Sequence, residues 1–299
     1  MYERHQDNVV MFLVLYVDDI LLIGNDVGAM SSVKIWLSSQ FDMKDLGEAN
    51  YILGIKLWRD RKNRMLGLSQ AGYIDKILAG FSMQNSKKGL LPFRHGVPLS
   101  DDQRLKTLEE KKTMRQVSYA SAVGSLMYAM LCTRPDICYS VGIVSRYQSN
   151  PRPKHWEVIK HILKYLKRTR DYMLVYRCED LIPISYTDFD FLSDLNFRKS
   201  TSSCVFPLGR GAISWRSVKQ SCIADSTMEA KYVVACEATK EAIWLKKFLS
   251  NLGVMRMEQI PITLFCDNSG AIAQSKYPRN HKKGKHTERK YHITQDIMA

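Results

Sequence analysis

A nine-residue apolar run, Val9–Val17, leads directly into two aspartates, Asp18 and Asp19, and a second apolar run, Ile20–Ile23, follows at once. A membrane span needs about 20 apolar residues, so the first run predicts a fully buried strand. Two such strands joined by a tight acidic turn predict a β-hairpin. The turn would hold two adjacent carboxylates on a rigid support, where they could bind a divalent cation. By pattern alone, a solvated turn is at least as good an interpretation.

Alternating helix and strand patterns continue to residue 83. Apolar residues recur at helical spacing over Val27–Phe41, which predicts an amphipathic helix. Two further strands, Tyr51–Trp58 and Met65–Leu68, flank a polar loop and predict a second hairpin. A helix is expected from Gly72 to Phe81. The expected apolar face of the first helix consists of Met30, Val33, Trp36, Leu37 and Phe41.

Helices dominate the next part of the chain. Residues 84–113 are polar, contain glycine, proline and lysine clusters, and are expected to form a linker with little regular structure. The patterns that follow predict helices at Tyr119–Met130, from Arg134-Pro135 to Tyr147 and at His155–Arg168, and a strand at Tyr172–Tyr176.

After Asp171 the residue pattern becomes typical of strands, and the remaining residues predict a compact α/β unit of about 115 residues. The expected elements are strands at Ile184–Thr187, Ser202–Leu208, Ala212–Trp215 and Ile262–Cys266, a long helix at Thr227–Leu252 and a helix from about Asn268. The predicted fold class is α/β, with an α+β first part and a mixed-sheet last part. We expect three segments, with residues 1–83, 84–180 and 181–299.

Positive charge limits the choice of partners. The 44 Lys and Arg against 30 Asp and Glu give a net charge of +14 and favour a polyanionic partner. Two segments, 152–170 and 276–290, each hold seven basic residues and one acidic residue. Such clusters are usually solvated faces, but one on each side of the boundary expected near residue 180 also suits a nucleic acid gripped through its phosphates. The candidate contacts are Lys160, Lys164, Lys167, Lys282, Lys283, Lys285 and Arg289.

Seven scattered cysteines without a C-x-x-C motif indicate reduced thiols rather than a disulfide framework or a zinc site. The first residues show no pattern of a secretion signal, and the sequence contains no run long enough for a membrane span. We therefore expect a cytoplasmic or nuclear protein without a membrane partner.

The string from Leu15 to Gly24 resembles the Tyr-Val-Asp-Asp signature of reverse transcriptases, specifically those of copia-type long-terminal-repeat retrotransposons. The resemblance implies that Asp18 and Asp19 bind Mg²⁺ or Mn²⁺ in a polymerase site and that the next elements form the primer-gripping hairpin and the start of the thumb. In that family the first catalytic aspartate and the fingers precede the signature, so we expect no polymerase activity from this chain alone. Further matching segments are Phe41–Gly47, Tyr51–Ile55, Leu68–Gln70, Tyr73-Ile74, Tyr119–Tyr128, Thr133–Asp136 and His155-Trp156.

The last part resembles the ribonuclease H domain of the same polyproteins. That chemistry needs several carboxylates converging on two metal ions about 4 Å apart. The resemblance assigns Asp188 and Asp267 as metal-binding aspartates at two strand ends and Glu288 as an acid that closes the site. Further matching segments are Arg198–Ser202, Ile213–Trp215, Ser226–Ala230 and Lys285–His292.

One position departs from the family pattern. Where the family has Glu-Ala-Glu-Tyr, this chain has Glu229-Ala230-Lys231-Tyr232, so Lys231 stands at the glutamate that binds metal. An ammonium there would take the place of the cation and remove a ligand. Glu229 cannot substitute, because two residues along a helix are a rotation of about 200°. Ser203, where the family has glycine, is a second departure.

Three functions follow as alternatives. The first is a Pol fragment that binds an RNA–DNA hybrid or template-primer and is impaired in RNA cleavage. In the second, the ribonuclease H unit stays active through Asp188, Asp267, Glu288 and a substitute carboxylate. The third is a basic nucleic-acid-binding module without turnover. Restoring the glutamate at Lys231 discriminates between the first two, because a gain in cleavage would identify Lys231 as the cause of the defect.

Overall fold

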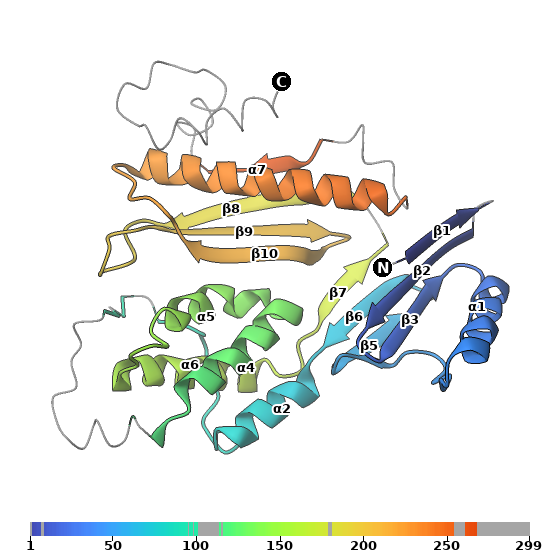
Figure 1. Ribbon diagram of the computed structural model, residues 1–299. Coiled ribbons are helices and arrows are strands. Elements are labelled where there is room, and N and C mark those ends of the chain that lie inside the picture. The colour runs from blue at the N-terminus through green and yellow to red at the C-terminus, as the bar shows by residue number, and fades with distance from the viewer. Residues whose placement is uncertain are drawn as a thin grey trace. The chain divides into compact units, whose positions relative to one another are not determined.

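The computed structural model contains helices and sheets, as expected for a mixed α/β chain (Figure 1). It describes residues 2–6, 9–94, 96–97, 99–100, 114, 116–178, 181–253 and 261–267. Contacts divide the chain into unit 1, with Met1–Ile52 and Ile243–Pro261, and unit 2, with Leu53–Ala242 and Ile262–Ala299. The boundaries expected near residues 83 and 180 stay predictions.

The predicted first hairpin is confirmed in unit 1. Strand β2 (Val9–Tyr16) pairs antiparallel with β3 (Asp19–Gly24), and β1 (Tyr2–Gln6) pairs with the other edge of β2. Helix α1 (Val27–Gln40) begins where the Asp26 carboxylate accepts a hydrogen bond of 2.8 Å from the Ala29 N–H. This side-chain cap satisfies a backbone donor that the first helical turn leaves free.

The burial expected for this hairpin is wrong. Of the residues Val9–Val17, only Met11 is buried, whereas Leu15, Tyr16 and Val17 are 56%, 56% and 77% exposed. The reason is the position of α1, whose Met30 side chain lies 3.4 Å from the place of a Cβ on Gly24, at the end of β3 remote from the turn. The tip therefore extends beyond the helix.

The apolar face of α1 is also less buried than expected. Leu37 is buried, but Trp36 is 59% exposed. Phe41 is also 59% exposed and lies beyond α1, because its extended backbone ends the helix at Gln40. Helical spacing identifies side chains on one face, yet only those that meet another element lose contact with water. Strand β4 (Tyr51–Ile52) ends this part of the chain.

Unit 2 contains the second predicted hairpin, which is confirmed. Strand β5 (Ile55–Asp60) pairs antiparallel with β6 (Met65–Ser69), and β7 (Leu174–Arg177) pairs with the other edge of β6. The expected strand at 51–58 is interrupted because Leu53 and Gly54 both adopt positive φ, at 49° and 75°. A strand cannot continue through two such residues.

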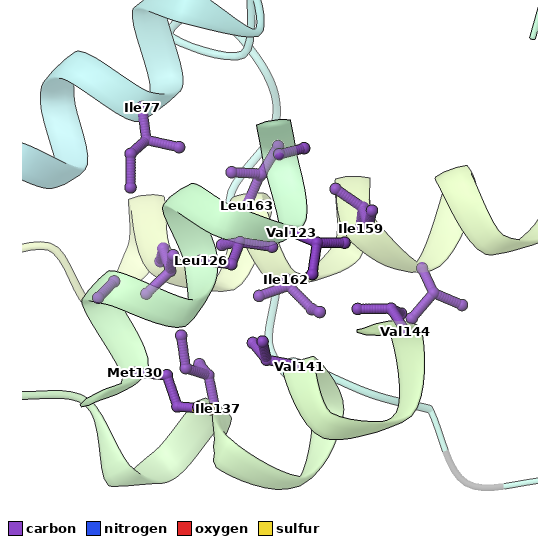
Figure 2. Close-up of a cluster of buried hydrophobic side chains, with 14 of the residues drawn as sticks. Ile77, Val123, Leu126, Met130, Ile137, Val141, Val144, Ile159, Ile162 and Leu163 are labelled. Carbon is purple, nitrogen blue, oxygen red and sulfur yellow. The ribbon is translucent and has the colours of Figure 1, made fainter. Parts of the chain in front are cut away.

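A helical core follows the hairpin, largely as predicted (Figure 2). Its helices bury apolar side chains such as Ile77, Leu126, Val141 and Ile162 against one another. These helices are α2 (Ala71–Gly80), α4 (Tyr119–Cys132), the 3-10 helix η1 (Pro135–Ile137), α5 (Cys138–Ser145) and α6 (Pro153–Arg168).

The predicted linker lies partly within the described residues. Residues 84–94 contain no helix or strand, as expected, but they dock against α6. The Gly89 N–H donates to the Lys164 carbonyl at 2.9 Å, and the Lys167 ammonium donates to the Ser86 carbonyl at 2.6 Å. Residues 95, 98 and 101–113 of the linker lie outside the described residues.

The second sheet has the order β10-β9-β8-β11. Its strands are β8 (Ile184–Asp190), β9 (Thr201–Leu208), β10 (Gly211–Lys219) and β11 (Thr263–Phe265). Strands β8, β9 and β10 are antiparallel, whereas β11 runs parallel to β8. Helix α7 (Thr227–Asn251) connects β10 to β11, and its first part covers one face of the sheet (Figure 1). The helix expected from Asn268 lies outside the described residues.

The helical core packs on the opposite face of this sheet. Ser214 donates to Glu241 of α7 at 2.7 Å, while the Trp215 indole donates to the Met130 carbonyl of α4 at 3.0 Å. Neighbouring strand residues point to opposite faces, so β10 is covered on both sides. At Gly142 of α5 a Cβ would lie only 3.1 Å from the Ser217 carbonyl oxygen, so glycine permits this close packing.

Asp194 anchors this contact between helices and sheet. Its carboxylate, 2% exposed, lies 3.0 Å from the Lys219 ammonium and 3.5 Å from the guanidinium of Arg146 at the end of α5. Burial alone would raise the pKa of Asp194, but hydrogen bonds from Lys219 and from the Phe197 N–H outweigh it and lower the pKa. The ionised carboxylate therefore joins the β8–β9 loop, β10 and α5.

We predict that Asp194→Asn destabilises the chain by about 2–4 kcal/mol, because it leaves two cations beside an uncharged group in a buried site. The control is Asp171→Asn, which removes an exposed partner of Arg170 and should cost less than about 1 kcal/mol. Because the folded pKa of Asp194 is lowered, its contribution is complete above the unfolded pKa near 4 and is lost as the pH falls further. Urea unfolding at several pH values measures both effects, and equal losses for the two variants would contradict the role of Asp194.

Candidate functional site

The first candidate site is the turn between β2 and β3. Tyr16 pairs with Asp19 across the hairpin, so Val17 and Asp18 form the turn and both aspartates are exposed. Val17 has a φ of 51°, a conformation that is rare for a β-branched residue. Backbone strain of this kind costs about 1–3 kcal/mol and persists where the surroundings impose it. The structure thus presents two adjacent carboxylates to solvent at the tip of a strained hairpin.

The second candidate site lies at the ends of β8 and β11. The parallel register pairs Tyr186 with Phe265, and their rings stack with centroids 5.2 Å apart. Asp188 and Asp267 each lie two residues beyond this pair. Asp267 follows the end of β11, but Asp188 lies inside β8, which continues to Asp190, so the strand end expected at Asp188 is wrong. Thr187 continues the strand contact by donating to the Phe265 carbonyl at 2.9 Å. The two aspartates named from the sequence therefore come from adjacent strands.

Lys231 reaches this place from α7. Its ammonium forms an ion pair with the Asp267 carboxylate and lies 5.1 Å from the centroid of the Phe189 ring. The Lys231 side chain is 10% exposed, whereas that of Asp267 is 72% exposed. A buried stem thus carries the ammonium to a carboxylate that faces solvent.

Asp188 does not share this contact. Asp188 pairs with Ser203 of β9, and Ser203 pairs with Ser217 of β10. Ser217 lies two residues from Trp215, so all of these side chains share the face of the sheet on which Trp215 contacts the helical core. Phe189 lies on the other face, toward α7. Asp188 is exposed and accepts a hydrogen bond of 2.8 Å from the Phe189 N–H.

Glu229 has a local role at the start of α7. Its carboxylate accepts a hydrogen bond of 2.9 Å from the Asp225 N–H, and its own N–H donates to the Ser226 hydroxyl at 3.1 Å. The two hydrogen bonds resemble a capping box, but the Glu229 carboxylate binds the residue before the one that caps its own N–H. Glu229 therefore stabilises the helix end, where it cannot take over the position of Lys231. Ser203, the other departure, donates to the Ser217 hydroxyl at 3.0 Å.

The basic residues named from the sequence fall in two groups. Lys160, Lys164 and Lys167 are half-buried on α6, and the last two meet the docked segment at residues 86–89. The other group and the acid expected to close the ribonuclease H site lie outside the described residues. These are Lys282, Lys283, Lys285, Arg289 and Glu288.

Two residues that shape the site were not predicted from the sequence. Phe189 supplies the ring under the Lys231 ammonium, and Asp194 fixes the loop that follows β8. The signal for Phe189 was its position directly after Asp188 on an expected strand, because alternation places it on the opposite face. Asp194 gave no comparable signal, since its partners Arg146 and Lys219 are distant in the sequence.

The residues described here do not fit the divalent cation that the ribonuclease H pattern implies. An ammonium has no lone pair to offer a metal, and its charge repels one. Asp188 also lies on the face of the sheet away from Lys231. Within the described residues, no group of three or more His, Cys, Asp or Glu side chains is arranged to hold a metal ion.

Comparisons with known proteins identify the family. The reverse transcriptase (RNA-dependent DNA polymerase) family matches residues 1–95. The retrovirus-related Pol polyprotein from transposon TNT 1-94 of Nicotiana tabacum is 45% identical over 297 residues, which cover 99% of this chain and 22% of that protein. That from transposon RE1 of Arabidopsis thaliana is 32% identical over 285 residues, covering 95% and 19%. An uncharacterized mitochondrial protein of Arabidopsis thaliana is 34% identical over 236 residues, covering 78% and 94%.

The chain belongs to the reverse transcriptase-containing Pol polyproteins of copia-type retrotransposons. It spans about a fifth of the length of the polyproteins it matches. No solved structure matches the chain. Among the helices in the described part of the chain, none has the length and apolar character needed to cross a membrane.

We predict that Val17→Gly stabilises the chain by about 0.5–1 kcal/mol, because glycine adopts positive φ without strain. The matched control is Val27→Gly, which removes a similarly exposed valine, 74% against 77%, from ordinary helical backbone. The control should be destabilised by a few tenths of a kcal/mol. Urea unfolding followed by circular dichroism measures both, and a loss of stability in Val17→Gly would contradict the strain at the turn.

Proposed function

We propose that this chain is a segment of a copia-type Pol polyprotein that binds an RNA–DNA hybrid or template-primer and is impaired in cleaving the RNA strand. Membership of a reverse transcriptase family supports nucleic-acid binding in general. The net charge of +14 and the basic segments support a duplex held through its phosphates.

One observation carries the impairment of cleavage. The ammonium of Lys231 is ion-paired with Asp267 at the position where the family places a metal-binding glutamate. Cleavage by this fold needs carboxylates that converge on divalent cations, and here a fixed positive charge neutralises one of them. Glu229 is committed to the helix cap. Glu229 therefore does not replace the missing ligand.

The hairpin turn belongs to the same proposal. Asp18 and Asp19 are exposed, adjacent carboxylates on a rigid turn, which suits them to hold Mg²⁺ or Mn²⁺ in a polymerase site. Carboxylate oxygens are the ligands these ions prefer. In this proposal they contribute to DNA synthesis by the polyprotein to which the segment belongs.

An active ribonuclease H is the second candidate function. It is favoured by the parallel pairing of β8 with β11, because Asp188 and Asp267 each lie two residues beyond the paired Tyr186 and Phe265. It requires that the ion pair of Lys231 opens and that another carboxylate joins the site.

For the native chain we predict no cleavage of a labelled RNA–DNA hybrid in Mg²⁺ or Mn²⁺ beyond that of Asp188→Asn, which controls for contaminating nuclease. Lys231→Glu should raise metal-dependent cleavage above the native level, because it restores a carboxylate. Gel analysis of the RNA strand measures all three proteins. Robust cleavage by the native chain that Asp188→Asn abolishes would establish the second candidate instead.

We predict that hybrid binding weakens steeply with salt and that Lys160→Ala with Lys164→Ala reduces the salt dependence. Each lost phosphate contact lowers the slope of log affinity against log salt by about one. The control replaces two exposed helix lysines outside both basic segments, Lys76 and Lys240, by alanine. Fluorescence anisotropy at several salt concentrations measures the slopes, and equal slopes in the two double variants would argue against α6 as the contact surface.

A further inference from the structure

The ammonium of Lys231 is held in a defined place. The residue is 9% exposed, so its stem is packed between α7 and the sheet. The Phe189 ring lies beneath the nitrogen at 5.1 Å, and a ring face attracts a cation. The partner carboxylate of Asp267 is 72% exposed. A positive charge is thus fixed at the edge where the solvent-facing strand ends lie.

This charge changes how a phosphate meets the site. A bare carboxylate at Asp267 would repel a phosphodiester, and sites of this fold offset that repulsion with divalent cations. In this chain the Lys231–Asp267 pair has no net charge. Replacing the lysine by methionine leaves one negative charge, and replacing it by glutamate leaves two. With native Lys231, no metal ion is needed to offset the repulsion between Asp267 and a bound phosphodiester.

We propose that the Lys231 ammonium stands in for the divalent cation, so that this unit binds the backbone of an RNA–DNA hybrid without metal. The inference rests on the hybrid binding proposed above and specifies its cation requirement. It also gives Lys231 a binding role in addition to the loss of cleavage, because the ammonium can donate hydrogen bonds to phosphate oxygens while Asp267 holds it in position.

The test measures the Kd of a short fluorescent RNA–DNA hybrid in EDTA and in Mg²⁺, with ionic strength matched by potassium chloride. All proteins comprise residues 1–299 and carry Asp18→Asn and Asp19→Asn, so that the hairpin turn gives no metal response. The protein with Lys231 should bind equally in both buffers, within about twofold. Lys231→Glu should bind about tenfold more weakly in EDTA and recover in Mg²⁺, because two carboxylates can then share an ion with a phosphate.

The control Lys231→Met keeps an apolar stem of similar length. It should bind more weakly than the lysine protein in EDTA and gain nothing from Mg²⁺, since it adds no ligand. If Lys231→Glu fails to fold by circular dichroism, the methionine variant decides the question alone. Binding by Lys231→Met equal to that of the lysine protein would overturn the inference, as would binding by the lysine protein that requires Mg²⁺.

Failure of the proposed function gives a different result. If neither the lysine protein nor its variants bind the hybrid in any buffer, hybrid binding itself is absent. If the lysine protein and both variants bind with the same Kd and the same response to Mg²⁺, hybrid binding is supported and the proposed role of Lys231 is wrong.

Discussion

The parallel pairing of β8 with β11 is the constraint on which the second candidate site depends. Parallel neighbours need a crossover connection, and in this sheet α7 provides it between β10 and β11. The crossover lays the helix on one face of the sheet, where Gln220 at the end of β10 donates to the Ala230 carbonyl at 3.0 Å. The next residue along α7 is Lys231. One topological requirement thus brings a helix residue and a strand-end aspartate together.

The other face of the same sheet is closed by the helical core. Trp215 joins β10 to α4, whereas Gly142 and the ion pairs of Asp194 join α5 to β10 and to the β8–β9 loop. The helical core thus supports the end of β8 on one face of the sheet, and α7 supports it on the other face. Tyr139 adds a hydrogen bond of 2.6 Å to Asp190 at the end of β8.

Much of the fold follows from sequence patterns. Alternation and turn residues predicted both hairpins, and apolar spacing predicted α6, whose buried residues include Ile159, Ile162 and Leu166. Burial was less predictable. Trp36 lies on the predicted apolar face of α1 but remains exposed, because exposure depends on which elements meet in space.

At the site, too, the sequence identified residues but not their contacts in space. The family resemblance identified Lys231 as a charge reversal, but the sequence did not show that Phe189 lies under its ammonium or that Glu229 caps α7. The capping role follows from a short-range pattern that begins at Ser226 and could have been recognised. The face occupied by Asp188 depends on strand register, which is set by long-range pairing with Ser203.

We infer that the Lys231 ammonium takes the place of a divalent cation beside Asp267. The most direct measurement is the binding of Mn²⁺, followed by electron paramagnetic resonance, to chains that carry Asp18→Asn and Asp19→Asn. With Lys231 present, adding Asp267→Asn should leave Mn²⁺ binding unchanged. With Lys231→Glu, a new Mn²⁺ site should form and disappear when Asp267→Asn is added. Mn²⁺ binding to the lysine protein that depends on Asp267 would contradict the account.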